Sequence, residues 1–288
     1  MHIFPTLLEE HGKHGTHAFP CKVHSVEAPM NTKEKIYCHW HNEVELLHIR
    51  NGKAILQIGD VQYPISTGDT ILIPSGSVHM VNGDNSPFSF TAVVFMPELI
   101  HSFTDDRIEE TCITPLIHWQ FNHSPVFHDH KQIQSHIMRM IETDKNREDG
   151  YELAMKIEIL HTMLEIYRCV KDLKVEHRIS TDEKTALLKA MVVYLQEHEN
   201  MPVSLKDMAD TFHISKGHLC RFFHDLTNMT VIEYLNYYRI NRSVQKLKHT
   251  YLSISEIAQQ TGFTNISYFN RTFRKYMHQS PGQFRKSI

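Results

Sequence analysis

The chain has 288 residues, 41% of them hydrophobic and 22% charged, a composition typical of a globular protein long enough for two domains. It contains neither an apolar run of about 18 residues nor an apolar leader flanked by basic residues, so we expect neither membrane insertion nor export. Five scattered cysteines without a CxxC pair favour a reducing cytoplasm over a disulfide framework or a cysteine zinc site.

The charge is unevenly distributed. The net charge is −3, yet residues 183–288 carry 14 Lys and Arg against 8 Asp and Glu, which is +6 and leaves −9 for residues 1–182. Such an asymmetry indicates a basic module that meets a polyanion, joined to an acidic module with another task. Ordinary drift of composition between domains is the alternative.

Residues 36–96 have the pattern of short strands. β-Branched and aromatic runs are separated by turn signals such as Asn51-Gly52 and Ser75-Gly76. The runs are VELLHI, AILQIG, VQYPI, DTILIP and FTAVVF. Many short strands at close spacing, without helices between them, predict a sandwich or small barrel, which we place at about residues 20–100.

The stretch HWHNEVE holds two imidazoles and two carboxylates within seven residues, and Glu45 is the carboxylate at metal-ligand spacing. From His39 the chain follows H-x-H-x3-E-x6-G, and from Gly68 to His79 it follows G-x5-P-x-G-x2-H. These patterns are similar to the two motifs of the cupin barrel. The resemblance covers about residues 30–100 and implies that His39, His41, Glu45 and His79 converge inside a barrel.

Three roles are open for these four side chains. They can line a pocket for a small molecule, or they can ligate a divalent metal, since imidazole and carboxylate suit Fe, Ni, Mn, Zn and Cu. Alternatively, His39 and His41 share one face of a strand by period-two alternation and are simply packed, with Trp40 on the opposite face. A second histidine-rich stretch, HSPVFHDH with His123, His128 and His130, is interpreted as a solvated loop.

Amphipathic helices are predicted from about residue 130 to 175. In YELAMKIEILHTMLEIYRCV the apolar residues Leu153, Ile157, Leu160, Leu164 and Tyr167 recur three and four positions apart. This stripe either covers the chain's own barrel or packs against a second subunit. The polar segment KDLKVEHRISTDEK then predicts the boundary between a first domain, 1–177, and a second, helical domain, 183–288.

The second domain contains an internal repeat. Residues 204–234 align with residues 253–284 at an offset of 49, which becomes 50 after one extra residue near Ile266. Each unit opens with a capping signal, Ser253-x-x-Glu256 or the weaker Ser204-x-x-Asp207. A short helix with an inward alanine follows, then a turn where Gly262 can adopt positive φ, then a helix opening at Ser215 or Thr264. This is a helix-turn-helix pattern, used twice.

Between the units, VIEYLNYYRINRSVQKLKHT lacks Pro and Gly and predicts one helix of about 27 Å. Two recognition helices on such a strut can reach successive major grooves, about 34 Å apart. The sequences YRINRSVQKL and SISEIAQQTGFTNISYFNRTFRKYMHQSPGQFR resemble the AraC/XylS family of transcriptional regulators across roughly residues 185–286. Ser243 replaces the family's usual alanine, and Gly217 stands where relatives often have a larger contacting residue.

The resemblance implies which side chains meet DNA. Base-facing positions are Lys216, His218, Cys220 and Arg221 in the first unit, and Asn265, Ile266, Ser267, Asn270 and Arg271 in the second. Arginine can bond guanine and asparagine adenine bidentately. Arg274, Lys275, Arg239 and Lys248 suit phosphates. The aromatic residues Phe222, Phe223, Phe269 and Phe273 are expected in the core.

The expected protein is therefore a two-domain α+β transcription regulator and not an enzyme. A cupin-like barrel followed by helices binds a small-molecule effector, and two helix-turn-helix units joined by a long helix bind promoter DNA. By the resemblance, the effector is a carbohydrate and the stripe on residues 150–172 makes a homodimer. The rival interpretation is a metal-dependent cupin enzyme or metal sensor fused to the DNA-binding domain.

Overall fold

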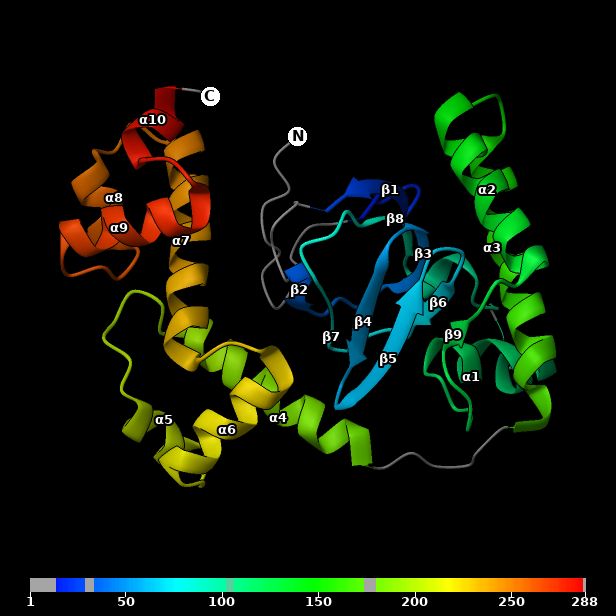
Figure 1. Ribbon diagram of the computed structural model, residues 1–288, viewed down its shortest axis with the longest axis horizontal. Coiled ribbons are helices and arrows are strands. Elements are labelled where there is room, and N and C mark those ends of the chain that lie inside the picture. Colours follow the sequence, from blue (N-terminus) through cyan, green and yellow to red (C-terminus); the bar gives the residue numbers. More distant parts are fainter. Residues whose placement is uncertain (1–13, 29–33, 103, 105, 174–179, 287–288) are drawn as a thin grey trace. The chain divides into compact units, whose positions relative to one another are not determined.

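The computed structural model describes residues 14–28, 34–102, 104, 106–173 and 180–286. This part of the chain divides into two compact units between Asp182 and Glu183 (Figure 1). The first is built mainly of strands and the second entirely of helices, as the sequence predicts. No helix within the described ranges has the length and apolarity needed to span a membrane.

The N-terminal unit contains two antiparallel sheets. One has the order β1-β8-β3-β6-β9 and the other β2-β7-β4-β5. The strands are β1 (Cys21–Glu27), β2 (Glu34–His39), β3 (Val44–Asn51), β4 (Lys53–Ile58), β5 (Val61–Ser66), β6 (Thr70–Ile73), β7 (His79–Gly83), β8 (Ser89–Phe95) and β9 (Val126–Phe127). Each of the five expected runs corresponds to one strand, namely β3, β4, β5, β6 or β8. The segment HSPVFHDH is more than a solvated loop, because β9 within it pairs with β6.

The central strand β3 is buried on both of its faces. Leu47 and Ile49 join a core that also holds Leu56 and Val81 of the other sheet. The alternate residues Val44 and Leu46 lie in a second core, with side chains of the helices that cover the outer face. Strands buried on both sides are continuously apolar rather than alternating, as VELLHI is. Side chains alternate along a strand, so Glu45 lies on the same face as Leu47 and Ile49. Its carboxylate is therefore between the two sheets, where apolar side chains are usual.

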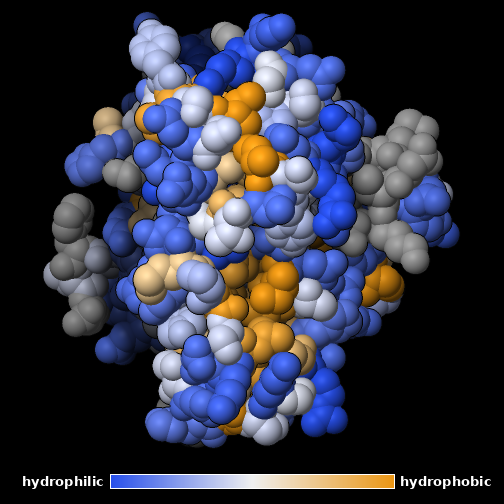
Figure 2. Space-filling view, turned by 90° about the vertical axis from the view of Figure 1, so that its left-hand side faces the viewer, coloured by the Kyte–Doolittle hydropathy of each residue, from blue (hydrophilic) through white to orange (hydrophobic). Residues whose placement is uncertain are grey.

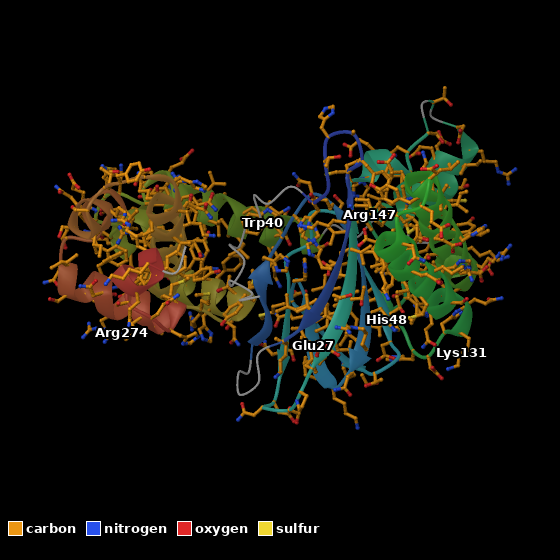
Figure 3. The ribbon with its side chains drawn as sticks, turned by 90° about the horizontal axis from the view of Figure 1, so that it is seen from above. Glu27, Trp40, His48, Lys131, Arg147 and Arg274 are labelled. Atoms are coloured by element: carbon orange, nitrogen blue, oxygen red, sulfur yellow. The ribbon has the colours of Figure 1, made fainter. Side chains whose placement is uncertain are left out.

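Helical segments complete this unit. They are η1 (Pro97–Leu99), η2 (Glu109–Ile113), α1 (Thr114–Ile117), α2 (Lys131–Asn146), α3 (Tyr151–Val170) and η3 (Lys171–Leu173). The long helices α2 and α3 lie side by side along the five-stranded sheet (Figure 1). Lys131 at the start of α2 and Arg147 at its C-cap are labelled in Figure 3.

Helix α3 covers the sheet with a different face from the one that its sequence singles out. Its buried side chains are Met155, Ile159, Thr162, Met163, Ile166 and Val170. The predicted stripe is instead mostly exposed: Leu153 is 65% exposed, Ile157 43%, Leu160 36% and Leu164 43%, and only Tyr167 packs partly on the core. The interpretation that this stripe covers the chain's own barrel is wrong. Helix α3 is apolar on two faces, and the face that carries Met155 and Ile159 packs on the sheet instead.

The C-terminal unit consists of two helix-turn-helix units around one long helix. Its helices are α4 (Ser180–Glu197), α5 (Leu205–Thr211), α6 (Lys216–Thr227), α7 (Val231–His249), α8 (Ile254–Gln260), α9 (Ile266–Met277) and α10 (Pro281–Lys286). The first unit is α5–α6, the second α8–α9, and α7 is the predicted strut. Ala209 and Ala258 are buried on the first helix of each unit, where a small side chain permits close approach.

The helix starts follow the capping signals, with one exception. Ser253 and Glu256 form a full capping box, whereas Ser204 accepts hydrogen bonds without a reciprocal partner. Ser215 caps α6, but α9 is capped by Asn265 and not by Thr264. The extra residue in the second unit moves the start of its helix by one position. Gly262 has φ +79°, as the turn requires.

Two residues of the C-terminal unit do not take the roles that the sequence predicts. Phe222 is only half-buried and stacks on His218, with ring centroids 6.0 Å apart, rather than joining the core. Arg239 is buried and donates to the carbonyl oxygens of Glu199 and Met201, each at 2.7 Å. Arg239 therefore fixes α7 against the chain after α4 and does not face phosphates. Ser243 in place of alanine is also buried, with its hydroxyl bonded to Arg239 O and Thr261 Oγ1.

Candidate effector site and DNA interface

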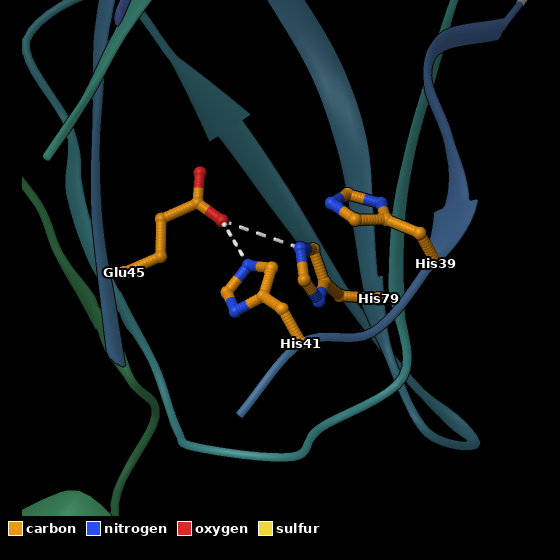
Figure 4. Close-up of side chains that lie close together, drawn as sticks. All are labelled: His39, His41, Glu45 and His79. Carbon is orange, nitrogen blue, oxygen red and sulfur yellow. Dashed lines mark hydrogen bonds and ion pairs between the residues drawn. The ribbon is translucent and has the colours of Figure 1, made fainter. Parts of the chain in front are cut away.

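The four residues singled out in the two cupin-like motifs lie together between the sheets. His39 on β2 and His79 on β7 are directly paired in the four-stranded sheet, and His41 follows β2 after Trp40. Glu45 reaches them from β3 of the facing sheet (Figure 4). All four are buried, with exposed fractions of 1–5%, and one ligand atom from each lies within 4.8 Å of the others. We call this set the inter-sheet cluster.

Backbone carbonyls orient the three imidazoles. His39 Nδ1 lies 2.8 Å from Tyr37 O, His79 Nδ1 2.8 Å from Ser77 O, and His41 Nδ1 3.1 Å from Glu43 O. A carbonyl oxygen can only accept, so each Nδ1 carries the proton of its ring. The Nε2 atoms of His41 and His79 face one carboxylate oxygen, Glu45 Oε2, at 3.2 and 3.3 Å (Figure 4).

A neutral imidazole protonated at Nδ1 presents the lone pair of Nε2, which repels a carboxylate oxygen. The short contacts between the rings and Glu45 are therefore favourable only with a hydrogen shared between Nε2 and Oε2, or with a cation among these atoms. Burial alone would raise the pKa of Glu45, but the hydrogen bonds and charges of His41 and His79 outweigh it and hold that pKa well below its usual range.

The donor set of the inter-sheet cluster also fits a divalent transition metal. Metal-bound histidines commonly give their other ring N–H to a carbonyl or carboxylate, which fixes the tautomer, and all three rings here do so. Three imidazoles and one carboxylate suit Zn, Ni, Fe, Mn or Cu by ligand type. His39, His41, Glu45 and His79 would hold such an ion.

The other conspicuous residues of the region take structural positions. Trp40 is buried, as expected for the face opposite His39. His130 caps α2, His128 lies 3.0 Å from Asp69 Oδ1, and the ring of His123 stacks on Phe127. These three histidines form no common ligand set among the residues that the structure describes.

In the C-terminal unit, most of the predicted DNA-contacting residues are exposed on the second helix of each helix-turn-helix. Ser267, Asn270, Arg271, Arg274 and Lys275 lie on one face of α9, three and four positions apart, and line an open hollow of about 530 Å³. Arg274 lies at the periphery of the helical unit (Figure 3). The surface turned to the viewer in Figure 2 is mostly hydrophilic, with apolar residues confined to narrow bands.

The remaining predicted contacts differ in accessibility. Lys216, His218 and Arg221 are exposed on α6, whereas Cys220 is half-buried. Asn265 and Ile266 are exposed at the start of α9, and Asn265 Oδ1 is occupied by the cap to Tyr268 N. Sequence reasoning missed Tyr268, whose ring lies 5.4 Å below the Arg271 guanidinium and whose hydroxyl accepts from Asn236 Nδ2. The sequence contains a signal for this contact, because Tyr268 precedes Arg271 by three residues, about one helical turn.

Comparisons with known proteins define the class. A family profile described as "AraC-like ligand binding domain" matches residues 27–171, and one described as "Helix-turn-helix domain" matches residues 208–287. The protein is thus a transcription regulator with a ligand-binding domain and a DNA-binding domain. The chain belongs to the AraC family of transcriptional regulators.

Individual relatives align with this chain over most of their length. The chain is 24% identical to the uncharacterized HTH-type transcriptional regulator YdeC of Bacillus subtilis, over 97% of this chain and 96% of that protein. It is 25% identical to the HTH-type transcriptional activator RhaS of an Enterobacter species, over 86% and 87%. A structure of ToxT from Vibrio cholerae aligns at 16% identity over 94% and 98% of the chains, with a TM-score of 0.45.

Proposed function

We propose that this regulator binds its effector at the inter-sheet cluster, and that the effector is a carbohydrate or a similarly polar small molecule. Four buried ionisable side chains support this site. Burying such groups costs free energy unless they are paired, and apolar residues would pack the same space more favourably. Imidazole and carboxylate groups suit the hydroxyls of a sugar. We further propose that the protein acts in the cytoplasm, where promoter DNA is found, and without catalysis.

Effector binding should be visible as a shift in both stability and DNA affinity. In a thermal-shift screen of sugars, we expect at least one to raise the Tm of the wild type, with no effect on His41→Ala. That sugar should change operator affinity, measured by fluorescence anisotropy, in the wild type alone. His118→Ala removes an exposed imidazole of the same unit and is the matched control. Equal operator binding with and without every stabilising sugar would contradict the coupling.

A bound metal is the second candidate for the same residues, and the shared orientation of the three rings favours it. Protein purified without a histidine tag or added metal should then contain about one transition-metal ion per chain, measured by inductively coupled plasma mass spectrometry. The ion should be absent from His41→Ala/His79→Ala that remains folded by circular dichroism. If the wild-type protein is folded and contains no metal, the four residues line the effector pocket instead.

For DNA we propose base contacts from α6 and α9, as the family resemblance implies, with Arg271 at the centre of the exposed face of α9. Arg271→Ala should weaken operator binding by about 1–3 kcal/mol and relax the preference at one base pair. Lys275 has its ammonium 3.7 Å from Glu233, at the end of the same face. Lys275→Ala should weaken all sequences about equally and lower the salt slope by about one.

These two outcomes are distinguished by binding titrations against a set of operator point variants at several salt concentrations. If Arg271→Ala keeps its full sequence preference, Arg271 does not contact a base.

We also propose that the protein is a homodimer formed through the exposed stripe of α3. Leu153, Ile157, Leu160 and Leu164 are spaced 4, 3 and 4 residues apart, the a/d spacing of a coiled-coil seam. The order of these intervals is the same from either end of the helix. A twofold axis between residues 158 and 159 therefore pairs Leu153 with Leu164 of the partner subunit, and Ile157 with Leu160 of the partner subunit. A self-complementary seam of this kind is what a symmetric dimer requires.

A further inference from the structure

A second group of ligand-type side chains joins α2 to α3. His136 lies on α2, and Glu158 and His161 lie three residues apart on α3. His136 Nδ1 is 2.7 Å from Glu158 Oε2, the rings of His136 and His161 are 5.1 Å apart, and a ligand atom from each residue lies within 4.8 Å of the others. The side chains of His136 and Glu158 are 14% and 16% exposed, whereas His161 is exposed. We call this set the α2–α3 cluster.

Arg139, one turn after His136, is the cationic neighbour of the α2–α3 cluster. Its Nε lies 2.9 Å from Glu158 Oε1, its Nη1 donates to Ser135 Oγ at 2.8 Å, and its Nη2 lies 2.5 Å from His136 Nδ1. The guanidinium thus holds one oxygen of the carboxylate, Oε1, and the other oxygen, Oε2, points to His136.

These contacts give His136 Nδ1 two incompatible demands. If Nδ1 carries a proton, it donates to Glu158 Oε2 and opposes the N–H of Arg139. If Nδ1 presents a lone pair, it accepts from Arg139 and repels Glu158 Oε2. A cation bound to both Nδ1 and Oε2 would satisfy the lone pairs of both atoms at once. The outward rotation of the half-exposed Arg139 Nη2 would make room for it.

We propose that the α2–α3 cluster is a site for a borderline transition-metal ion such as Zn²⁺ or Ni²⁺. His136, Glu158 Oε2 and His161 supply two imidazoles and one carboxylate, and the exposed edge leaves the remaining coordination positions to water. Arg139 Nε keeps Glu158 Oε1 and orients the carboxylate, as a neighbour of a metal ligand often does. The ion cross-links α2 and α3 and so fixes the helix that carries the exposed apolar stripe.

The site is tested by titrating metal-free, full-length protein with Co²⁺, whose visible absorption reports coordination, and with Zn²⁺ by calorimetry. We expect His161→Ala to lower the affinity of one site by about tenfold or more. His249→Ala, which removes an exposed imidazole outside both clusters, should leave every site unchanged. A Co²⁺ spectrum and a Zn²⁺ isotherm that are the same in the wild type and His161→Ala would overturn the proposal.

Arg139→Gln separates a metal site from a structural ion pair. For a metal site we expect it to keep or raise Zn²⁺ affinity, since a competing cation is removed, and Zn²⁺ should raise the Tm of this variant. Failure of Arg139→Gln to bind Zn²⁺, with its fold intact by circular dichroism, would show that the cluster is an ion pair only. Because Arg139→Gln leaves the inter-sheet cluster intact, both measurements on it are made in the His41→Ala/His79→Ala background, where Zn²⁺ binding and a rise in Tm report the α2–α3 cluster alone.

Discussion

Replacing Gly262 by alanine should destabilise the C-terminal unit by about 3 kcal/mol or more and abolish operator binding. The residue has φ +79°, and a Cβ there would lie 2.1 Å from Glu199 O and 2.8 Å from Arg239 Nε. Those atoms form the partly buried hydrogen bond from Arg239 to Glu199 O, so relief of the clash would displace Arg239 as well. Urea unfolding, with anisotropy of labelled operator DNA, measures both effects.

Steric contact, more than the left-handed backbone, sets the size of this effect. His213 occupies the equivalent turn of the first unit with φ +54° and is not glycine. The backbone conformation alone is therefore tolerated in this fold, at a cost of about 1–2 kcal/mol. At Gly262 the close approach of Glu199 O adds a clash with backbone, which cannot rotate away.

Gly217 provides the matched control. A Cβ at this position in α6 meets nothing within 4 Å, and its φ is not in the left-handed region. Gly217→Ala should leave stability unchanged or raise it by up to about 1 kcal/mol, because alanine reduces the entropy of the unfolded chain. Equal destabilisation by the two substitutions would contradict the steric explanation for the effect at Gly262.

The sequence predicted best those features of the fold that are determined by residues close together in the chain. Capping residues and the turn at Gly262 are each contained within a few residues, and the internal repeat is visible by aligning the sequence with itself. Together they define both helix-turn-helix units. The strands VELLHI and AILQIG were similarly bounded by turns. By contrast, β1 and β9 are defined by pairing with β8 and β6, far away in the chain, and β9 is only two residues long. No local pattern specifies such a partner.

The candidate sites show the same division. The spacing of the two cupin-like motifs brought His39, His41, Glu45 and His79 to attention, and the structure brings all four together. The carbonyls of Tyr37, Glu43 and Ser77 that orient the rings could not be found from side-chain identity. The α2–α3 cluster was missed because His136 comes from another helix, although the spacing of Glu158 and His161 on α3 was visible.

The exposed apolar stripe of α3 gives the second large effect. Leu160→Glu should raise the dimer dissociation constant by about a hundredfold or more, equivalent to about 3 kcal/mol. In the proposed symmetric dimer, each Leu160 packs against Ile157 of the partner subunit. One substitution therefore buries two carboxylates without partners near the axis. Analytical ultracentrifugation should find the variant at the monomer mass of 33.8 kDa where the wild type is a dimer.

Val61→Glu is the control for this substitution, since Val61 is similarly exposed, at 40%, but lies on β5 rather than α3. It should remain dimeric. Circular dichroism should be unchanged in both variants, because neither side chain belongs to a core. A Leu160→Glu protein that dimerises as tightly as the wild type would show that another surface joins the subunits.

Loss of the dimer also has a defined consequence for DNA binding. The helix-turn-helix units lie in the other compact unit, so a single half-site should bind Leu160→Glu as tightly as it binds the wild type. A DNA with two half-sites gains affinity from a dimer because the second contact is intramolecular, often by 10²–10⁴-fold. This gain should disappear in Leu160→Glu and persist in Val61→Glu. A variant that loses single half-site affinity as well would instead indicate a folding defect in the DNA-binding unit.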